Sequence, residues 1–281
     1  MVESVIIYGA SATGQRIYEN IKHEVNVIAF IDEDKKKWGK SIDNIVIYSP
    51  DYLSTDDKYS RIYIGVLTFY SEIMDELKRR GISESKINDS YVSLPIKARN
   101  EFLRSLSLQL REQDIYSGAV AEVGVFRGDF AKVINEVFYD RKCYLFDTFE
   151  GFSDSDCLIE ETISDKKVKT GYFSNTSETL VLSKMKYPQN CIIRKGYFPE
   201  TILDNEEQFV FVNLDADLYA PTLAGLEYFY PRMLNGGVIL VHDYFSQAFD
   251  GAKKAVLEYC NTNNIDYMPI GDTLSVAIMK K

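Results

Sequence analysis

The sequence predicts an α/β protein built from two successive units of alternating strands and helices. Short apolar runs alternate with stretches of helical period along most of the chain, which is typical of βαβ units and a mostly parallel sheet. A chain of 281 residues is long enough for one large or two modest domains. The pattern divides the chain into residues 1–95, a linker helix over 96–118 and a second domain over 119–281.

Composition and charge narrow the function classes. Hydrophobic residues make up 46% of the chain, which is enough for a packed core, and the four cysteines lack the CxxC spacing of a zinc site. A net charge of −10 leaves no basic excess to displace counterions, so we expect no nucleic-acid partner. No apolar stretch approaches the roughly 20 residues of a membrane span, and no signal sequence precedes the first strand. We therefore expect a soluble, cytoplasmic protein.

The first unit, residues 1–95, opens with a βαβ pattern. An apolar run, the turn "GASATG", an amphipathic helix and a second apolar run ending in Asp32 follow one another. The turn puts a helix N-terminus beside a strand end, where free N–H groups can hold a phosphate. Ser11 stands where the dinucleotide-binding motif has its middle glycine, so the backbone cannot approach a pyrophosphate as closely. Nucleotide binding and a structural role both stay open.

The rest of the first unit continues the alternation. The apolar runs "NIVIYSP" and "RIYIGVL" are followed by the helical stretch "FYSEIMDELKRRG", and the pattern ends near Pro95. In this order the segments resemble the small Rossmann-type domain of bacterial polysaccharide-biosynthesis proteins, some of which modify nucleotide sugars. The resemblance implies a Rossmann-like domain of the nucleotide-binding type.

The linker region is predicted to be helical. Its stretch "KARNEFLRSLSLQLREQD" has a helical period and carries Phe102, Leu103, Leu106 and Leu110 near one face. We expect this helix to join the two units and to be able to cap a site in the second one.

The second unit repeats the alternation over a longer stretch. Its expected strands are "AVAEVGV", "CYLFDTF", "CIIRKGY", "FVFVNLDAD" and "GGVILVHDY", with two closing runs, "DYMPIG" and "LSVAIMK". Its expected helices are "DFAKVINEVF", "SETLVLSKMK", "APTLAGLEYFYPRM" and "GAKKAVLEYC". This order predicts a mostly parallel sheet with helices on both faces and a ligand site beyond the carboxyl ends of the strands.

Acids and glycines follow the first two of these strands. Glu122 precedes a loop that contains Gly124 and Gly128. Asp147 ends the next strand roughly 20 residues further on, where a carboxylate can accept the ribose hydroxyls of an adenosine ligand. Dehydrogenases and methyltransferases share this spacing, so it leaves the cofactor open.

Two later strand ends carry a second set of chemical groups. "VNLDADLYAPT" delivers Asp215 and Asp217, and "GGVILVHDY" delivers His242 and Asp243. Neighbouring parallel strands lie about 4.8 Å apart, so these groups can converge on one cation. Carboxylate oxygens with one imidazole suit magnesium or a similar divalent ion better than zinc in a thiolate cage. In the alternative interpretation, the acids cap the helices that follow.

Taken together, the motifs resemble one family. "AEVGVFRGDFA", "LFDTFEGF", "SNTSE", "KGYFPET", "LDADLYAPT" and "GGVILVHDY" stand in the order and spacing of the macrocin O-methyltransferase family, over about residues 97–281. The resemblance implies a class I (Rossmann-like) methyltransferase fold. It also implies methylation of a sugar hydroxyl that depends on S-adenosylmethionine and magnesium, in polysaccharide or glycoside biosynthesis.

The resemblance also implies residue roles. The methionine side of the cofactor would be lined by Glu122, Gly124, Phe126, Arg127 and Gly128. The ribose and adenine would be held by Asp147, Thr148 and Phe149. The metal would be bound by Asp215, His242 and Asp243, although relatives often carry Asp at the histidine position.

The proton acceptor is a separate question, because the chain has two histidines, His23 in the first unit and His242 at the expected metal. We therefore expect either Asp217 or a hydroxide on the metal to accept the proton, with Tyr172 and Lys195 as further candidates. The catalytic residues would then be Asp215 and Asp217.

Two rival interpretations come from other classes. The chain could be a nucleotide-sugar-binding module whose second domain is inactive, but the "DAD" and "HDY" motifs argue against inactivity. It could also be an NAD-dependent oxidoreductase, but Ser11 in the glycine-containing turn argues against that. The expected partner is a sugar or nucleotide-sugar acceptor, recognised in part by residues 1–95, and a homo-oligomer stays open.

Overall fold

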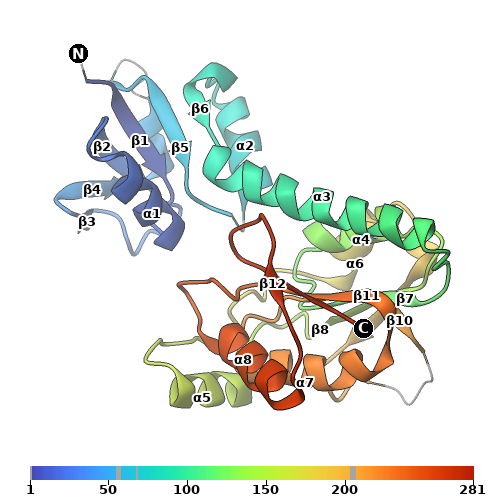
Figure 1. Cartoon of the computed structure of the whole chain (residues 1–281). Helices are drawn as coiled ribbons and strands as arrows, with labels where there is room; N and C mark the ends of the chain where they lie inside the picture. The colour runs from blue at the N-terminus through green and yellow to red at the C-terminus, as the bar shows by residue number, and fades with distance from the viewer. Residues whose placement is uncertain (1, 55–57, 68, 203–206) are drawn as a thin grey trace. The chain divides into compact units, whose positions relative to one another are not determined.

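The computed structural model describes residues 2–54, 58–67, 69–202 and 207–281. The chain divides into two compact units, Met1–Ile96 and Lys97–Lys281 (Figure 1). None of the helices in these described ranges is both long and apolar enough to cross a bilayer.

The first unit contains a six-stranded sheet in the order β3-β4-β2-β1-β5-β6. Its strands are β1 (Ser4–Tyr8), β2 (Asn26–Ile31), β3 (Ser41–Ile42), β4 (Ile45–Tyr48), β5 (Arg61–Ile64) and β6 (Ile87–Asn88), and its helices are α1 (Ala12–Ile21) and α2 (Tyr70–Arg79). β3 and β4 pair antiparallel, and the other described pairs are parallel. The alternation expected for this unit is therefore confirmed.

The glycine-containing turn between β1 and α1 is held by contacts inside the first unit. Ser11 caps α1, because its Oγ accepts a hydrogen bond from the N–H of Gly14 and donates one to the carbonyl of Gly65. A Cβ on Gly14 would lie 1.7 Å from the carbonyl oxygen of Gly9, so this position requires glycine. Ser11 thus completes the end of the helix where the motif would have a glycine.

The carboxylate of Asp32 closes the same turn. Its Oδ2 accepts the Ala10 N–H at 2.9 Å and the Lys37 ammonium at 2.8 Å, while its Oδ1 accepts the Asp34 N–H at 2.9 Å. An acid at this strand end binds a ribose hydroxyl in dinucleotide-binding folds. Here both of its oxygens already have protein donors.

The second unit contains a seven-stranded sheet in the order β12-β13-β11-β10-β7-β8-β9. Its strands are β7 (Ala119–Val123), β8 (Cys143–Asp147), β9 (Cys191–Lys195), β10 (Phe209–Leu214), β11 (Met233–Val241), β12 (Met268–Pro269) and β13 (Val276–Met279). Its helices are α4 (Asp129–Val137), α5 (Asp154–Ile163), α6 (Glu178–Lys184), α7 (Tyr219–Phe229) and α8 (Gly251–Asn263). The first five strands run parallel and the two closing strands pair antiparallel. This is the predicted class I methyltransferase type of fold.

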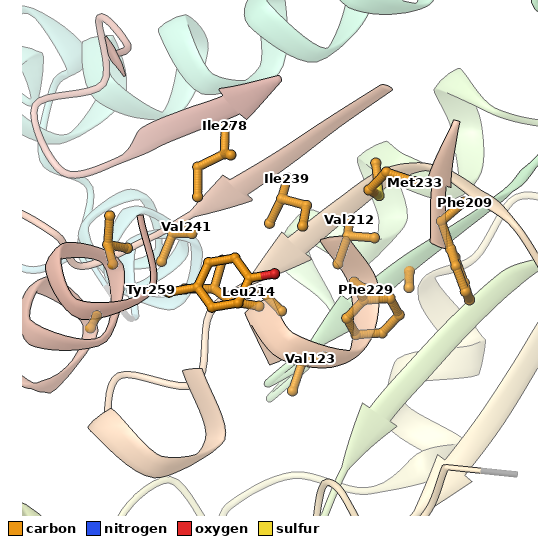
Figure 2. Packing of buried hydrophobic residues seen from close by; sticks show 14 of the residues in the cluster. Val123, Phe209, Val212, Leu214, Phe229, Met233, Ile239, Val241, Tyr259 and Ile278 are labelled. Carbon is orange, nitrogen blue, oxygen red and sulfur yellow. The ribbon is translucent and has the colours of Figure 1, made fainter. Parts of the chain in front are cut away.

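Two hydrophobic clusters cover the two faces of this sheet. One lies against α7 and α8 and includes Val212, Phe229 and Tyr259 (Figure 2). The other lies against α4 and α6, on the side where the later part of α3 also packs, and includes Ile134 and Val181 (Figure 1). The strands are apolar on both faces, as expected for a parallel sheet covered by helices on both sides.

Helix α3 (Ser90–Glu112) begins earlier than the expected linker helix and continues through Pro95. Leu103, Leu106 and Leu110 are buried in the second unit, which confirms the predicted apolar face. Burying one leucine side chain stabilises a fold by about 1.5–3 kcal/mol, and a proline inside a helix costs about 3 kcal/mol. Three buried leucines therefore outweigh the proline.

Helix α5 is the longest of the α-helices and β-strands that the sequence pattern did not reveal, the others being the two-residue strands β3 and β6. Its residues "DSDCLIEETI" place Leu158 and Ile159 on the exposed side, so the apolar positions do not mark the buried face. The helix is instead held by a buried carboxylate. Glu160 is fully buried and accepts the N–H of Tyr219, the first residue of α7, at 3.0 Å. A Cβ on Gly251, the first residue of α8, would lie 2.2 Å from the same oxygen.

We expect Glu160→Ala to lower the free energy of unfolding by about 1–3 kcal/mol, since the N–H of Tyr219 would lose a buried acceptor at a helix N-terminus. Glu161→Ala is the matched control, because this neighbour on α5 is exposed. Urea denaturation measures both variants. Equal midpoints for Glu160→Ala and Glu161→Ala would contradict an anchoring role for Glu160.

Candidate active site

The carboxyl ends of β7, β8, β10 and β11 meet at one edge of the second sheet. The chain order reverses between β7 and β10, since β8 and β9 extend the sheet on one side of β7 while β10 and β11 extend it on the other. Open α/β sheets bind their ligands at such a reversal, beyond the carboxyl ends of the strands. The residues predicted for the site follow these four strands.

The loop after β7 is pressed against the end of β10. The Asp215 N–H donates to the Val123 carbonyl at 2.8 Å, and a Cβ on Gly124 would lie 2.1 Å from the Asp215 carbonyl oxygen. Gly124 also has a positive φ of 83°, and Gly128, with a φ of 76°, caps α4. The backbone conformation and packing of the protein itself thus explain why glycine stands at both positions. Their contact with a cofactor stays a prediction.

Asp147 joins the loops that follow β7 and β8. Its Oδ2 accepts the Phe126 N–H at 2.7 Å, and its Oδ1 accepts the Phe149 N–H at 2.7 Å. Burial raises the pKa of Asp147, although these backbone donors act in the opposite direction. The carboxylate is therefore held in one orientation at the edge of the sheet, where an acid can accept hydroxyl groups of a ligand.

The side chains of the two residues that follow Asp147 make contacts within the protein. The Thr148 hydroxyl donates to the Gly151 carbonyl at 2.9 Å and accepts the Glu150 N–H at 3.1 Å. The Phe149 side chain is only 7% exposed and belongs to the core on the α4 side. The predicted contacts of Thr148 and Phe149 with ribose and adenine stay predictions.

Glu122 and Arg127 take different positions around the predicted cofactor loop. Glu122 is 1% exposed, and its Oε1 accepts the side-chain amide of Asn213 at 2.8 Å. Burial and the nearby charge of Asp215 raise the pKa of Glu122 well above its usual range. Arg127 donates to the Asn175 carbonyl at 3.3 Å on the exposed side of the loop.

The structure brings Asp215, His242 and Asp243 together. Each offers one ligand atom, and these atoms lie within 4.8 Å of one another. His242 Nδ1 lies 3.0 Å from Asp215 Oδ1 and 2.7 Å from Asp243 Oδ2. Burial alone would lower the pKa of His242, but the two carboxylates outweigh it and raise the pKa to about 10. Two carboxylates and an imidazole at this spacing can hold a divalent cation, which would displace the proton from His242.

Asp217 lies beside this group. Burial and the neighbouring carboxylate of Asp243 raise the pKa of Asp217 well above its usual range. A divalent cation favours ionised carboxylates, so it would act against this shift. Asp217 is thus placed where a bound cation would control its protonation.

Backbone strain also gathers at this edge. The non-glycine residues Phe126, Phe149, Asp217 and Asp243 have φ angles of 48°, 56°, 58° and 60°, and they follow β7, β8, β10 and β11 respectively. Left-handed backbone is disfavoured for residues with a side chain, and it clusters where structure is kept for a function. The four loops at the candidate site share this feature.

Arg99 is the site residue that sequence reasoning missed. It lies on α3, and its Nη2 donates to Asp215 Oδ2 and to Asn213 Oδ1, each at 2.8 Å. A signal was present in the sequence, because Arg99 precedes the buried Leu103, Leu106 and Leu110 by four, seven and eleven positions and therefore lies on the same helix face. A charged residue on the apolar face of a helix needs a buried partner.

Comparison with known proteins identifies two families along the chain. The family described as macrocin O-methyltransferase (TylF) matches residues 79–278, and a family described as C2185-like, N-terminal, matches residues 1–88. A curated relative, mycinamicin III 3''-O-methyltransferase from Micromonospora griseorubida, is 26% identical over 189 residues, which are 63% of this chain and 72% of the relative.

Solved methyltransferase structures share the fold. The O-methyltransferase NovP superposes with a TM-score of 0.52 at 20% identity, over 74% of this chain and 88% of that one. The calicheamicin methyltransferase CalS11 superposes with a TM-score of 0.53 at 16% identity, over 82% of this chain and 89% of that one. Because the TylF family match spans more than half of its residues, the chain belongs to the macrocin O-methyltransferase family.

Proposed function

We propose that this enzyme transfers a methyl group from S-adenosylmethionine to a sugar hydroxyl, with the help of a divalent cation, in polysaccharide or glycoside biosynthesis. The observation that carries the proposal is the convergence of Asp215, His242 and Asp243. They meet where the strand order of the sheet reverses, in a chain of the macrocin O-methyltransferase family. The family match and the curated O-methyltransferase relative support the reaction class.

The cofactor would lie at the ends of β7 and β8. S-adenosylmethionine supplies a methyl group on a positively charged sulfur, which an oxygen nucleophile can attack. Asp147, held by the Phe126 and Phe149 N–H groups, would accept hydroxyl groups of the ribose. The loop from Gly124 to Gly128 would face the methionine part, and Glu122 lies buried beneath it.

The cation would be held by Asp215, His242 and Asp243. Carboxylate oxygens with one imidazole fit magnesium or manganese, and a bound cation would lower the pKa of an acceptor hydroxyl and fix its position. Asp217 lies next to Asp243 and would accept the proton that the hydroxyl loses. The alternative reading of these acids as helix caps is weaker, because they face one another and His242.

An NAD-dependent oxidoreductase is the less favoured of the two alternatives from other classes, and the first unit gives it little support. Ser11 stands where the dinucleotide-binding motif has its middle glycine, and Asp32 forms an ion pair with the Lys37 ammonium at 2.8 Å. An inactive binding module, the stronger of the two alternatives, is disfavoured because the charged groups of the "DAD" and "HDY" motifs converge at the candidate site.

We expect Asp147→Ala to weaken S-adenosylmethionine binding by about 1–3 kcal/mol, since a fixed acceptor would be lost. Calorimetry with S-adenosylmethionine and with NAD on the purified protein measures this and separates the two cofactor classes. Asp140→Ala is the matched control, because this acid lies in the exposed turn after α4. Binding of NAD but not S-adenosylmethionine would reject the methyltransferase proposal.

For the cation, we expect Mg²⁺ to raise the melting temperature of the EDTA-treated protein, because a ligand that binds only the folded state stabilises it. Asp243→Asn removes one ligand charge and should abolish most of this shift. Asp266→Asn serves as control, since Asp266 is a surface acid paired with Lys281. An identical shift in wild type and Asp243→Asn would place the cation elsewhere.

We also propose that the first unit takes part in acceptor recognition, through the phosphates of a nucleotide-linked sugar. The N-terminus of α1 favours an anion. Lys37 lies beside it, with its ammonium 3.2 Å from the Ala10 carbonyl oxygen and 2.8 Å from Asp32 Oδ2, and it would have to leave Asp32 to reach a phosphate. This role would add binding energy remote from the reacting hydroxyl.

We expect Lys37→Met to weaken binding of UDP or dTDP by the full chain, while Lys36→Met, which alters an exposed neighbour, leaves it unchanged. Calorimetry measures both variants. If neither nucleotide binds the wild-type chain, nucleotide recognition is removed from the proposal.

The role of the first unit can also be tested by removing it. A truncated chain for this purpose should begin at Ser90, because α3 starts there and carries Arg99.

A further inference from the structure

A line of hydrogen-bonded side chains runs beneath the candidate metal site. Glu122 accepts the side-chain amide of Asn213, Asn213 accepts Arg99, and Arg99 also donates to Asp215. Glu122 and Asn213 face each other on the neighbouring strands β7 and β10, and both are buried. The line therefore starts in the core of the sheet and ends at a predicted metal ligand.

Asn213 depends on Arg99 for one of its two hydrogen bonds. Its Nδ2 donates to Glu122 and its Oδ1 accepts from Arg99, so the orientation of the amide is determined. The side chain is fully buried, and a buried amide oxygen without a donor is costly. Removing Arg99 would thus disturb more than one contact.

Arg99 itself is held in place from two sides. Its side chain is 12% exposed, and the carbon of its guanidinium group lies 3.9 Å from the ring centroid of Phe130 on α4. A guanidinium stacked on an aromatic ring keeps its plane while its edge donates hydrogen bonds. Arg99 therefore offers Asp215 a donor that cannot easily turn away.

The two oxygens of Asp215 have different partners. Oδ2 accepts Arg99 at 2.8 Å, while Oδ1 lies 3.0 Å from His242 Nδ1, on the side of the candidate metal ligands. Arg99 thus opposes rotation of the carboxylate and keeps Oδ1 turned toward His242, on the side of the candidate metal ligands. Outer partners of metal ligands act in this way in known metal sites.

We propose that Arg99 is a positioning residue for the divalent-cation site, which holds Asp215 so that its Oδ1 faces the cation. The inference rests on the proposed metal-dependent function. A different role would be simple charge balance among the carboxylates. The two roles predict opposite results, because a positive charge near the site repels a cation and its removal would tighten binding, whereas loss of a positioning partner weakens binding.

The test measures the affinity of the full chain for Mn²⁺ in the absence of acceptor. Electron paramagnetic resonance detects the Mn²⁺ that stays free. Arg99→Met should weaken the affinity about 10–100-fold, as is usual when an outer partner of a ligand is removed. Arg99→Lys should recover part of the loss, because an ammonium can still donate to Asp215 but cannot stack as a planar group. Arg104→Met is the matched control, since Arg104 is an exposed arginine on the same helix.

The outcomes separate cleanly once circular dichroism shows that the variants are folded. Unchanged or tighter Mn²⁺ binding in Arg99→Met would overturn the positioning role. If that variant does not fold, Arg99→Lys decides, and an affinity equal to or tighter than wild type overturns it. If wild type binds no Mn²⁺, the proposed metal site fails, and the inference fails with it.

Discussion

The gathering of like charges at one edge of the second sheet is the constraint on which the site depends. Asp215, Asp217 and Asp243 are packed against one another in a largely buried place, where carboxylates repel and lose their hydration. Two positive groups, Arg99 and His242, lie in direct contact with Asp215 and lower its pKa against the effect of burial. A cation held by Asp215, His242 and Asp243 would take the place of the proton on His242 and compensate the carboxylates with a larger positive charge.

The fold brings these charges together because of its strand order. The strand order reverses between β7 and β10, so the loops that follow these strands turn away from each other at the edge of the sheet. The loop after β7 can approach β10 only because Gly124 has no side chain. The strained residues after four strands show that the loops are held by their surroundings rather than by local preference. The geometry of the site is thus kept by the packed sheet below it.

Helix α3 connects this constraint to the core. Its leucines bury against the sheet, and the same face carries Arg99 to Asp215. Apolar packing fixes the helix along its length, so the guanidinium arrives at a set position without a loop of its own. A segment that looks like a connection between two units therefore provides a charged group that the candidate site requires.

The sequence by itself determined the alternation of strands and helices, the family, and the identity of the acids at the strand ends, because periodicity and motif spacing are local properties. It also indicated that Asp215, His242 and Asp243 could meet, since parallel strands share one carboxyl edge. It did not reveal α5, whose buried face is marked by Glu160 rather than by apolar residues.

Tertiary structure decided the rest. It turned Phe149 into the core, buried Glu122 against Asn213 and brought Arg99 to Asp215, 116 positions away in the chain. Such pairings depend on which surfaces pack together, and no local pattern encodes a contact between residues so far apart.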